Sequence, residues 1–349
     1  MPKRSANQRP TVVSVAAAAG VSIGSVSSVL NNRHLERRIS PATVRKIREV
    51  AQRMGYFPNI GAKQLRSRGS AKNNIVLALI SSFEAPIPLI NHFILAIRRA
   101  ITEGKFRRKD YLLSLMIEMY PAGKLKEMPG LLTGDHFNGG IVMNTVADDD
   151  QFLSRSHLPY PVVLINRTIA GYTSVTEAPH AGGRSAELLV ERKRSHLVVL
   201  HSKSLTQSTQ ARVDSFIKRS DELLGRASRE VVASELSETG AHEAMRAFFA
   251  AGGEIDGIYA TSDGLALGAY RAIKEKGLDI PRDIAVLGVG DYEIAPFFDP
   301  PLTCVGVSHR ELAERASLLL LKQLEGGAQQ PQSVFAPTVE VLRASTGDR

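Results

Sequence analysis

The sequence predicts an all-α helix-turn-helix unit at the N-terminus, followed by a larger α/β core of parallel, doubly wound sheets in two lobes. Three observations support this fold class. Positive charge is concentrated in the first fifth of the 349 residues, two short helical patterns joined at a glycine lie in the same region, and strand-like apolar runs alternate with helical ones from residue 75 onward. We therefore divide the chain into a helix-turn-helix domain at 1–58, a linker at 59–74 and a core at 75–349.

The N-terminal charge predicts a polyanionic partner. Residues 1–72 hold 14 Lys and Arg against two acidic residues, whereas residues 73–349 hold 30 basic and 33 acidic residues. A compact basic unit attached to a near-neutral body is typical of proteins that bind nucleic acid. A solvated basic face that only aids solubility is the alternative explanation of the charge alone.

The sequence lacks the motifs of enzymes, metal sites and membrane proteins. It has no P-loop and no H-E-x-x-H, and the G-x-S-x-G match at residues 20–24 follows an alanine-rich helix where a hydrolase needs a strand. Cys304 is the single cysteine and the nine histidines lack metal spacing, so we expect no catalytic residue, no metal and no cofactor. No apolar stretch approaches about 20 residues and no secretory signal is present, so we expect a cytoplasmic protein without membrane contact.

Three short helices are expected in the first domain. The first covers 11–19 and ends at Gly20, the second covers 23–30, and the third begins after Ser40 and covers 41–54. In such a unit the second helix enters the major groove, and its outward face contacts bases and phosphates. The candidates for this contact are Ser22, Ile23, Gly24, Ser25, Ser27, Ser28 and Asn31.

The core reads as a series of buried parallel strands separated by helices. Near-continuous apolar runs indicate strands that are covered on both faces. They occur at 75–80, 111–119, 139–144, 162–166, 196–202, 230–235, 257–261 and 283–290. Helices are expected between them, for example at 208–224, 242–251 and 264–276. Ligands of such sheets bind beyond the carboxyl ends of the strands, so we expect a cleft at the ends of the first, seventh and eighth runs.

Two long stretches resemble the lactose-repressor (LacI) family of bacterial transcription regulators. TVVSVAAAAGVSIGSVSSVLNN and RISPATVRKIREVAQRMGYFPN are similar to its DNA-binding domain, and TSDGLALGAYRAIKEKGLDIPRDIAVLGVGDYEIAPFFDPPLTCV and PTVEVLRASTG to its core. The resemblance covers nearly the whole chain and implies a periplasmic-binding-protein-like core with three crossovers. Lobe 1 is then expected at about 75–167 and 305–335, and lobe 2 at about 168–304 and 336–349.

The linker resembles the family's hinge helix, which forms when two subunits pair on DNA and inserts a leucine into the minor groove. Leu65 matches that leucine and Ala62 the small residue beside it. An apolar wedge of this kind kinks the duplex, whereas a plain basic linker is the alternative. Gly61 replaces an apolar residue and should lower helicity by up to about 1 kcal/mol. The expected minor-groove contacts are Asn59, Ala62, Lys63, Leu65 and Arg66.

Two departures from the family pattern lie in the first domain. Ser14 replaces an Asp, and Ser28 replaces an Arg near the end of the second helix. A guanidinium can contact both acceptors of a guanine, which a serine hydroxyl cannot. The resemblance therefore implies DNA binding but leaves the operator sequence open.

The cleft residues also combine matches with departures. Arg212 matches the family's pocket arginine, whose planar fork suits a carboxylate or a pair of hydroxyls. Serine and glycine replace longer polar groups elsewhere, so we expect a sugar acid or substituted glycoside rather than a plain hexose. The expected effector-binding residues are Ser82, Arg212, Ser262, Asp263, Gly290 and Asp291.

The leading functional hypothesis is a regulator, and more specifically a repressor, that binds a palindromic operator as a homodimer. Its affinity for DNA would be controlled by a small polar effector, a carbohydrate or sugar acid, between the lobes. The alternative is a DNA-binding regulator of the same fold that no longer senses a small molecule and uses the core for dimerisation or protein partners. A free sugar-binding or sugar-modifying protein is disfavoured by the basic N-terminal unit.

Overall fold

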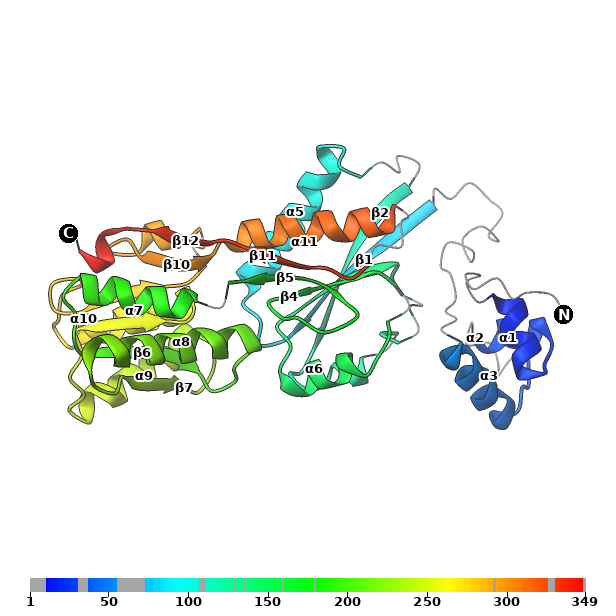
Figure 1. The fold of residues 1–349 in the computed structure, drawn as a ribbon, viewed down its shortest axis with the longest axis horizontal. Helices are drawn as coiled ribbons and strands as arrows, with labels where there is room; N and C mark the ends of the chain where they lie inside the picture. The colour runs from blue at the N-terminus through cyan, green and yellow to red at the C-terminus, as the bar shows by residue number, and fades with distance from the viewer. Residues whose placement is uncertain are drawn as a thin grey trace.

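The computed structural model contains a three-helix N-terminal unit and a two-lobed core with one six-stranded sheet in each lobe (Figure 1). The two lobes lie one after the other along the long axis of the core. The residues that the structure describes are 11–30, 37–54, 73–106, 111–128, 130–132, 134, 136–158, 160–178, 180–290, 293–325 and 330–347.

The N-terminal unit packs three helices around one small core. They are α1 (Val12–Ala19), α2 (Ile23–Leu30) and α3 (Pro41–Arg53), as the sequence predicted. Thr11 and Ser14 form a reciprocal capping box at the start of α1, so Ser14 takes a capping role although the family's Asp is missing. Gly20 ends α1 in the left-handed conformation with φ +60, which permits the tight turn into α2.

The core of this unit is made of small and β-branched side chains. Val15, Ala16 and Ala19 of α1 pack against Val26 and Val29 of α2. Helix α3 closes the core with Val44, Ile47, Val50 and Ala51. Because the apolar positions of α2 face inward, its other side is left for contact with a partner.

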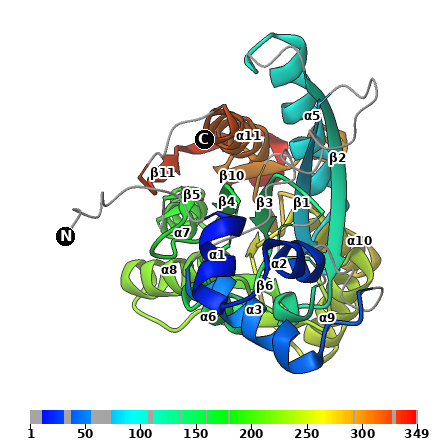
Figure 2. The same cartoon turned by 90° about the vertical axis from the view of Figure 1, so that its right-hand side faces the viewer.

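Lobe 1 is built on an all-parallel sheet with strand order β11-β5-β4-β3-β1-β2. Apolar clusters lie on both faces of this sheet, and helices α5 and α11 cover one of them (Figure 2). Its elements are β1 (Asn73–Ser82), α5 (Ile87–Thr102), β2 (Tyr111–Tyr120), β3 (Gly139–Met143), α6 (Ala147–Ser154), β4 (Val162–Ile165), β5 (Thr173–Glu177), α11 (His309–Leu324) and β11 (Ser333–Ala336).

Lobe 2 repeats the plan with strand order β12-β10-β9-β8-β6-β7, in which only β12 is antiparallel to its neighbour. Helices α9 and α10 pack on one face, and α7 and α8 on the other. Its elements are α7 (Ala181–Glu191), β6 (Leu197–Ser202), α8 (Gln207–Leu224), β7 (Arg229–Ala233), α9 (Glu238–Ala250), β8 (Gly257–Ala260), α10 (Asp263–Glu275), β9 (Ala285–Gly288), β10 (Thr303–Val307) and β12 (Thr338–Val341).

The chain crosses between the lobes three times, but the first two crossings lie later than the sequence-based boundaries. Strand β5 pairs with β4 and β11 in the first sheet, so lobe 1 continues to Glu177 rather than ending near 167. Strand β10 pairs with β9, so lobe 2 continues to Val307 rather than 304. The run of β5 lacks the apolar signature of the other strands because Val175 is its one apolar residue, although all five of its residues are buried.

Within the described residues, no single helix is long and apolar enough to cross a membrane. The helices Val12–Ala19 and Ile23–Leu30 reach the length and apolar composition of a membrane span only when they are taken together, and they meet at a 110° bend. These are α1 and α2, whose apolar residues fill the core of the N-terminal unit.

Candidate functional site

The exposed side of α2 is small, polar and uncharged. Ser22 and Gly24 are exposed, and the side chain of Ile23 is 50% exposed although it is apolar. Ser25, Ser27 and Ser28 are half-buried. None of the α2 residues carries a charge, so this face offers hydroxyls, backbone groups and one apolar side chain to a partner.

Ser22 has a structural task as well. Its Oγ accepts a hydrogen bond from the backbone N–H of Ser25 at 3.0 Å and lies 2.9 Å from the Oγ of that residue. This is the geometry of an N-cap, which satisfies one of the open N–H groups of the helix. Of the expected DNA-contacting residues, Asn31, Asn59, Ala62, Lys63, Leu65 and Arg66 lie outside the described part of the chain.

The core has a cavity of about 180 Å³ that residues of both lobes line. In each lobe the strand order reverses between the first and third strands in sequence, at β1 and β3 and again at β6 and β8. Ligands of doubly wound sheets bind beyond the carboxyl ends of strands at such reversals. Ser82 ends β1 and Asn144 follows β3 in lobe 1, whereas Ser202 ends β6 and Thr261 follows β8 in lobe 2. All four residues line the cavity. The two reversal points therefore face one another across a single site.

Three of the six expected effector residues line this cavity: Ser82, Arg212 and Ser262. Ser82 Oγ accepts a hydrogen bond from Asn144 Nδ2 at 2.7 Å, and Ser262 caps α10 by accepting from the backbone of Leu265 at 3.2 Å. Asp263 does not line the cavity; it is 2% exposed, and its Oδ1 lies 3.9 Å from the buried thiol of Cys304.

Gly290 does not line the cavity either, and Asp291 lies outside the described residues. Gly290 has φ +95, and a Cβ built there would lie 2.0 Å from Cε1 of His309. The volume that a side chain at position 290 would fill is therefore taken by this imidazole, and Gly290, which was expected to bind the effector, lies outside the cavity lining.

His309 begins α11 and lines the cavity, although the sequence did not single it out. Burial lowers its pKa to about 3, and the positive charge of Arg212 and the neighbouring His92 act in the same direction. The ring of His92, from α5, is stacked on it with a centroid distance of 6.2 Å. His309 is therefore a neutral imidazole at physiological pH and contributes no cation to the cavity.

Arg212 projects from α8 and is buried, as a pocket arginine should be, but it is already paired. Its Nε lies 2.5 Å from Oε1 of Glu177 at the end of β5, and the two side chains are 8% and 5% exposed. The pair joins lobe 2 to lobe 1. The cation that was expected to bind a ligand carboxylate is therefore already compensated, through its Nε, by a carboxylate of the chain itself.

The sequence analysis also missed several polar residues around the cavity. Asn144 and Asn166 follow β3 and β4 in left-handed backbone conformations with φ +54 and +57, which asparagine tolerates better than most residues. Glu84 and Glu235 line the cavity from opposite lobes. An asparagine directly after an apolar strand was a readable signal for the first two, whereas no local pattern reveals the acidic residues.

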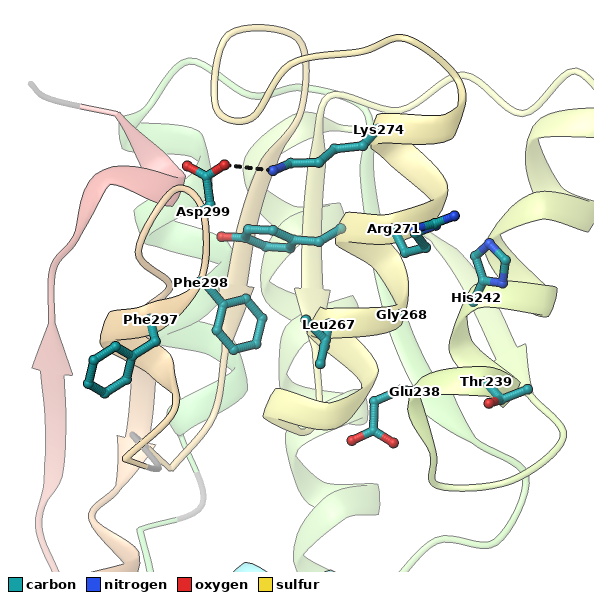
Figure 3. Close-up of a pocket in the computed structure, with 11 residues that line it drawn as sticks. Glu238, Thr239, His242, Leu267, Gly268, Arg271, Lys274, Phe297, Phe298 and Asp299 are labelled. Atoms are coloured by element: carbon teal, nitrogen blue, oxygen red, sulfur yellow. Dashed lines mark hydrogen bonds and ion pairs between the residues drawn. The ribbon is translucent and has the colours of Figure 1, made fainter.

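A larger groove of about 500 Å³ lies away from the interlobe cavity, on the outside of lobe 2 (Figure 3). Helices α9 and α10 and the segment before β10 line it. In Figure 3, Leu267 and Phe298 lie in the middle of the view, and Lys274 pairs with Asp299 at one side with Nζ 2.9 Å from Oδ2. Phe297 is 82% exposed, the highest value among the large apolar side chains of the described residues.

Comparison with protein-family models finds two matches in this chain. Residues 11–59 match the model described as bacterial regulatory proteins, lacI family. Residues 186–346 match a periplasmic binding protein-like domain. The two matches correspond to the three-helix unit with the start of the linker, and to lobe 2 with the returning segments of the core.

Curated relatives match along nearly the whole chain. The HTH-type transcriptional regulator CelR of Thermobifida fusca is 25% identical over 97% of this chain and 98% of its own length. The HTH-type transcriptional repressor PurR of Mannheimia succiniciproducens is 26% identical over 96% of this chain and 98% of its own length.

Solved structures share the fold. A lac repressor dimer bound to operator and the anti-inducer ONPF superimposes with a TM-score of 0.68 at 22% identity, covering 98% of this chain and all of that one. A CelR–cellobiose complex superimposes with a TM-score of 0.65 at 22% identity, covering 97% of this chain and all of that one. The helix-turn-helix unit and the two-lobed core are thus found together in proteins of known structure.

Proposed function

Because the chain belongs to the LacI family of bacterial regulatory proteins and is a DNA-binding transcriptional regulator, we propose that it represses transcription from a two-fold symmetric operator under the control of a small carbohydrate. The observation that carries the effector role is the convergence of both strand-order reversals on one polar cavity. The cavity is lined chiefly by hydroxyls and amides, which suit the hydroxyls of a sugar. The CelR–cellobiose complex, which shares the fold, supports a carbohydrate as the class of ligand.

The DNA contact is assigned to the exposed face of α2 and to the linker. The recognition helix alone reads only a few base pairs, so two copies are needed for a specific site. The second copy would place an equal helix on the other half-site. The residues expected to contact the major groove remain Ser22, Ile23, Gly24, Ser25, Ser27, Ser28 and Asn31, and those expected to contact the minor groove remain Asn59, Ala62, Lys63, Leu65 and Arg66.

We assign dimerisation to the core, with the groove of Figure 3 as part of the interface. Phe297, Ile294 and Leu267 are exposed by 82%, 51% and 39%, which is unusual clustering for a surface that faces only water. A two-fold interface uses the same patch on both subunits, so these side chains would cover one another. Light scattering of Phe297→Glu should report monomers, whereas Phe335→Glu, on exposed β11, should remain dimeric.

Operator binding can be tested by selecting genomic fragments with the purified full-length protein. The proposal expects one enriched, two-fold symmetric motif and a log–log salt dependence with a slope of roughly −0.9 per neutralised phosphate. Equal affinity for random duplex, or an affinity that ignores salt, contradicts sequence-specific binding. Adding carbohydrates to the selected complex then tests the effector role separately.

Two observations favour the alternative that the core no longer senses a small molecule. The cavity of about 180 Å³ is smaller than the usual ligand pocket of about 300 Å³ or more, and its arginine is already paired. Under this alternative the core serves dimerisation or protein partners only. Failure of every carbohydrate to change operator affinity, with intact operator binding, would support it.

A further inference from the structure

The charge balance of the interlobe cavity carries an inference about the kind of effector it accepts. Arg212, Glu84 and Glu235 are the lining residues with an ionised side chain at neutral pH, since His309 stays uncharged. Arg212 is compensated by Glu177, which lies within 2.5 Å of it. The two remaining carboxylates therefore give the described wall of the cavity an excess of negative charge.

Those two carboxylates come from opposite lobes. Glu84 follows β1 and its Oε1 lies 3.4 Å from the backbone N–H of Ala122, which donates to it. Glu235 follows β7 and accepts a hydrogen bond from the hydroxyl of Ser237 at 2.6 Å. Within the described ranges, neither forms an ion pair with a cation. A ligand between the lobes would meet a carboxylate on each side.

The neutral part of the wall also offers acceptors. Asn166 lines the same cavity, and its Oδ1 is buried without a hydrogen-bond donor among the described residues. A buried acceptor without a donor costs roughly 1–3 kcal/mol, so a ligand that supplies a donor removes a penalty. Ligand hydroxyls and ammonium groups donate hydrogen bonds, whereas a carboxylate only accepts them.

The position of the Glu177–Arg212 pair is tightly constrained. Gly182 of α7 approaches α8 so closely that a Cβ there would lie 1.9 Å from the carbonyl oxygen of Arg212. This contact holds the backbone of Arg212 against the start of α7, a few residues after Glu177. A ligand carboxylate beside Arg212 would meet a guanidinium that Glu177 already compensates, and displacing Glu177 would break a buried ion pair and leave an uncompensated charge.

We propose that Glu177 is a specificity-determining residue that blocks acidic ligands from Arg212, and that the cleft selects an amino-bearing or neutral polyol. This inference rests on the proposed effector function and names the charge of its ligand. It replaces the sequence-based expectation of a sugar acid. The preferred order is a hexosamine over the matching hexose, and the hexose over the matching hexuronic acid.

The experiment is a binding titration of matched hexose, hexosamine and hexuronic acid against the full-length protein. An ion pair between the single ammonium of the hexosamine and a partly exposed carboxylate is worth up to roughly fivefold in affinity, so the hexosamine should bind up to about fivefold more tightly than the hexose. The double variant Glu84→Gln and Glu235→Gln should abolish this advantage. Both side chains are exposed, so the variant should fold as the wild type does.

Glu177→Gln supplies the complementary test, because it removes the negative charge and keeps an amide oxygen beside Arg212. It should gain binding of the hexuronic acid by at least tenfold relative to the hexose. If Glu177→Gln does not fold, the double variant still decides the charge preference. Circular dichroism and the melting temperature of each variant separate these cases.

Different results would contradict the charge preference of the cleft and the proposed effector role. Tightest binding of the hexuronic acid by wild type overturns the inference and leaves the effector role standing. If the double variant binds the three ligands in the same order of affinity as the wild type, Glu84 and Glu235 do not cause the preference for the hexosamine. Absence of binding by every member of the series overturns both the ligand class and the effector role, whereas operator binding is measured independently.

Discussion

The recognition helix and the interlobe cavity both depart from the family pattern, but the departures have different consequences. Ser28 lies on a single helix whose outer face is uncharged, so the loss of a guanidinium there changes what the helix can contact. In the cavity Arg212 is kept, but Glu177, from a strand in the other lobe, forms an ion pair with it. On the exposed face of α2, a substitution at one position changes what the helix can bind. In the cavity, what Arg212 can bind also depends on Glu177, which comes from a distant part of the chain.

The largest effect is expected from a charge placed in the core of the N-terminal unit. Val26 is fully buried in α2, so Val26→Asp should unfold the three helices and abolish operator binding, because burying an unpaired carboxylate costs several kcal/mol in a small core. The melting transition of the two-lobed core should not change. Val13→Asp, whose position is 59% exposed on α1, is the matched control. A loss of core stability in Val26→Asp would show that the two regions do not unfold independently.

Gly290, which packs against the imidazole of His309, should be the next most sensitive position. Gly290→Ala combines a strained φ of +95 with a Cβ 2.0 Å from His309, and should destabilise the core by about 2–5 kcal/mol. Gly171 has φ +90 with no atom within 4 Å of its Cβ position, so Gly171→Ala isolates the backbone strain at about 1–3 kcal/mol. Chemical denaturation measures both. Equal losses in the two variants would mean that the imidazole moves aside freely.

Restoring the family's arginine on α2 should change specificity more than stability. Ser28→Arg should favour operators with a guanine at one position of each half-site by about 1–3 kcal/mol per contact. Comparing the motifs selected by wild type and variant measures this effect. The same motif in both selections would place residue 28 away from the base edges.

The smallest effect, when measured over a single unit of pH, is the acid dependence of core stability. The pKa of His309 is lowered from 6.5 to about 3, and burial also lowers the pKa of His92. As the pH falls below about 6.5 the unfolded chain binds these protons first, so the free energy of unfolding should fall between pH 6.5 and pH 3, by at most about 1.4 kcal/mol per pH unit for each histidine. His309→Gln should reduce this slope, and His196→Gln, on an exposed loop, should not. A wild-type stability that rises on acidification contradicts the buried neutral imidazoles.

The same comparison explains which parts of the fold could be predicted from the sequence. All three N-terminal helices and eight of the core strands were found from periodicity, capping residues and apolar runs, because these signals are local. The strands at 173–177, 303–307 and 333–336 were missed, since each is only four or five residues long and polar residues or a glycine interrupt its apolar pattern.

The site was predictable to a smaller extent. Ser82, Arg212 and Ser262 line the cavity as expected from the strand ends and the family motif. The pairing of Arg212 with Glu177 and the packing of His309 against Gly290 depend on where separate segments meet in space. No spacing within one segment encodes such contacts, so the charge of the cavity became apparent only from the fold.

The central claim is that the cleft and the DNA-reading unit are energetically coupled, and one titration tests it most directly. Operator affinity of the wild-type protein is measured with increasing amounts of the carbohydrate that binds the core most tightly. The account predicts a saturable change of roughly 5- to 150-fold in operator affinity, with the same concentration dependence as binding to the core. A cleft that fills while operator affinity stays constant would contradict it.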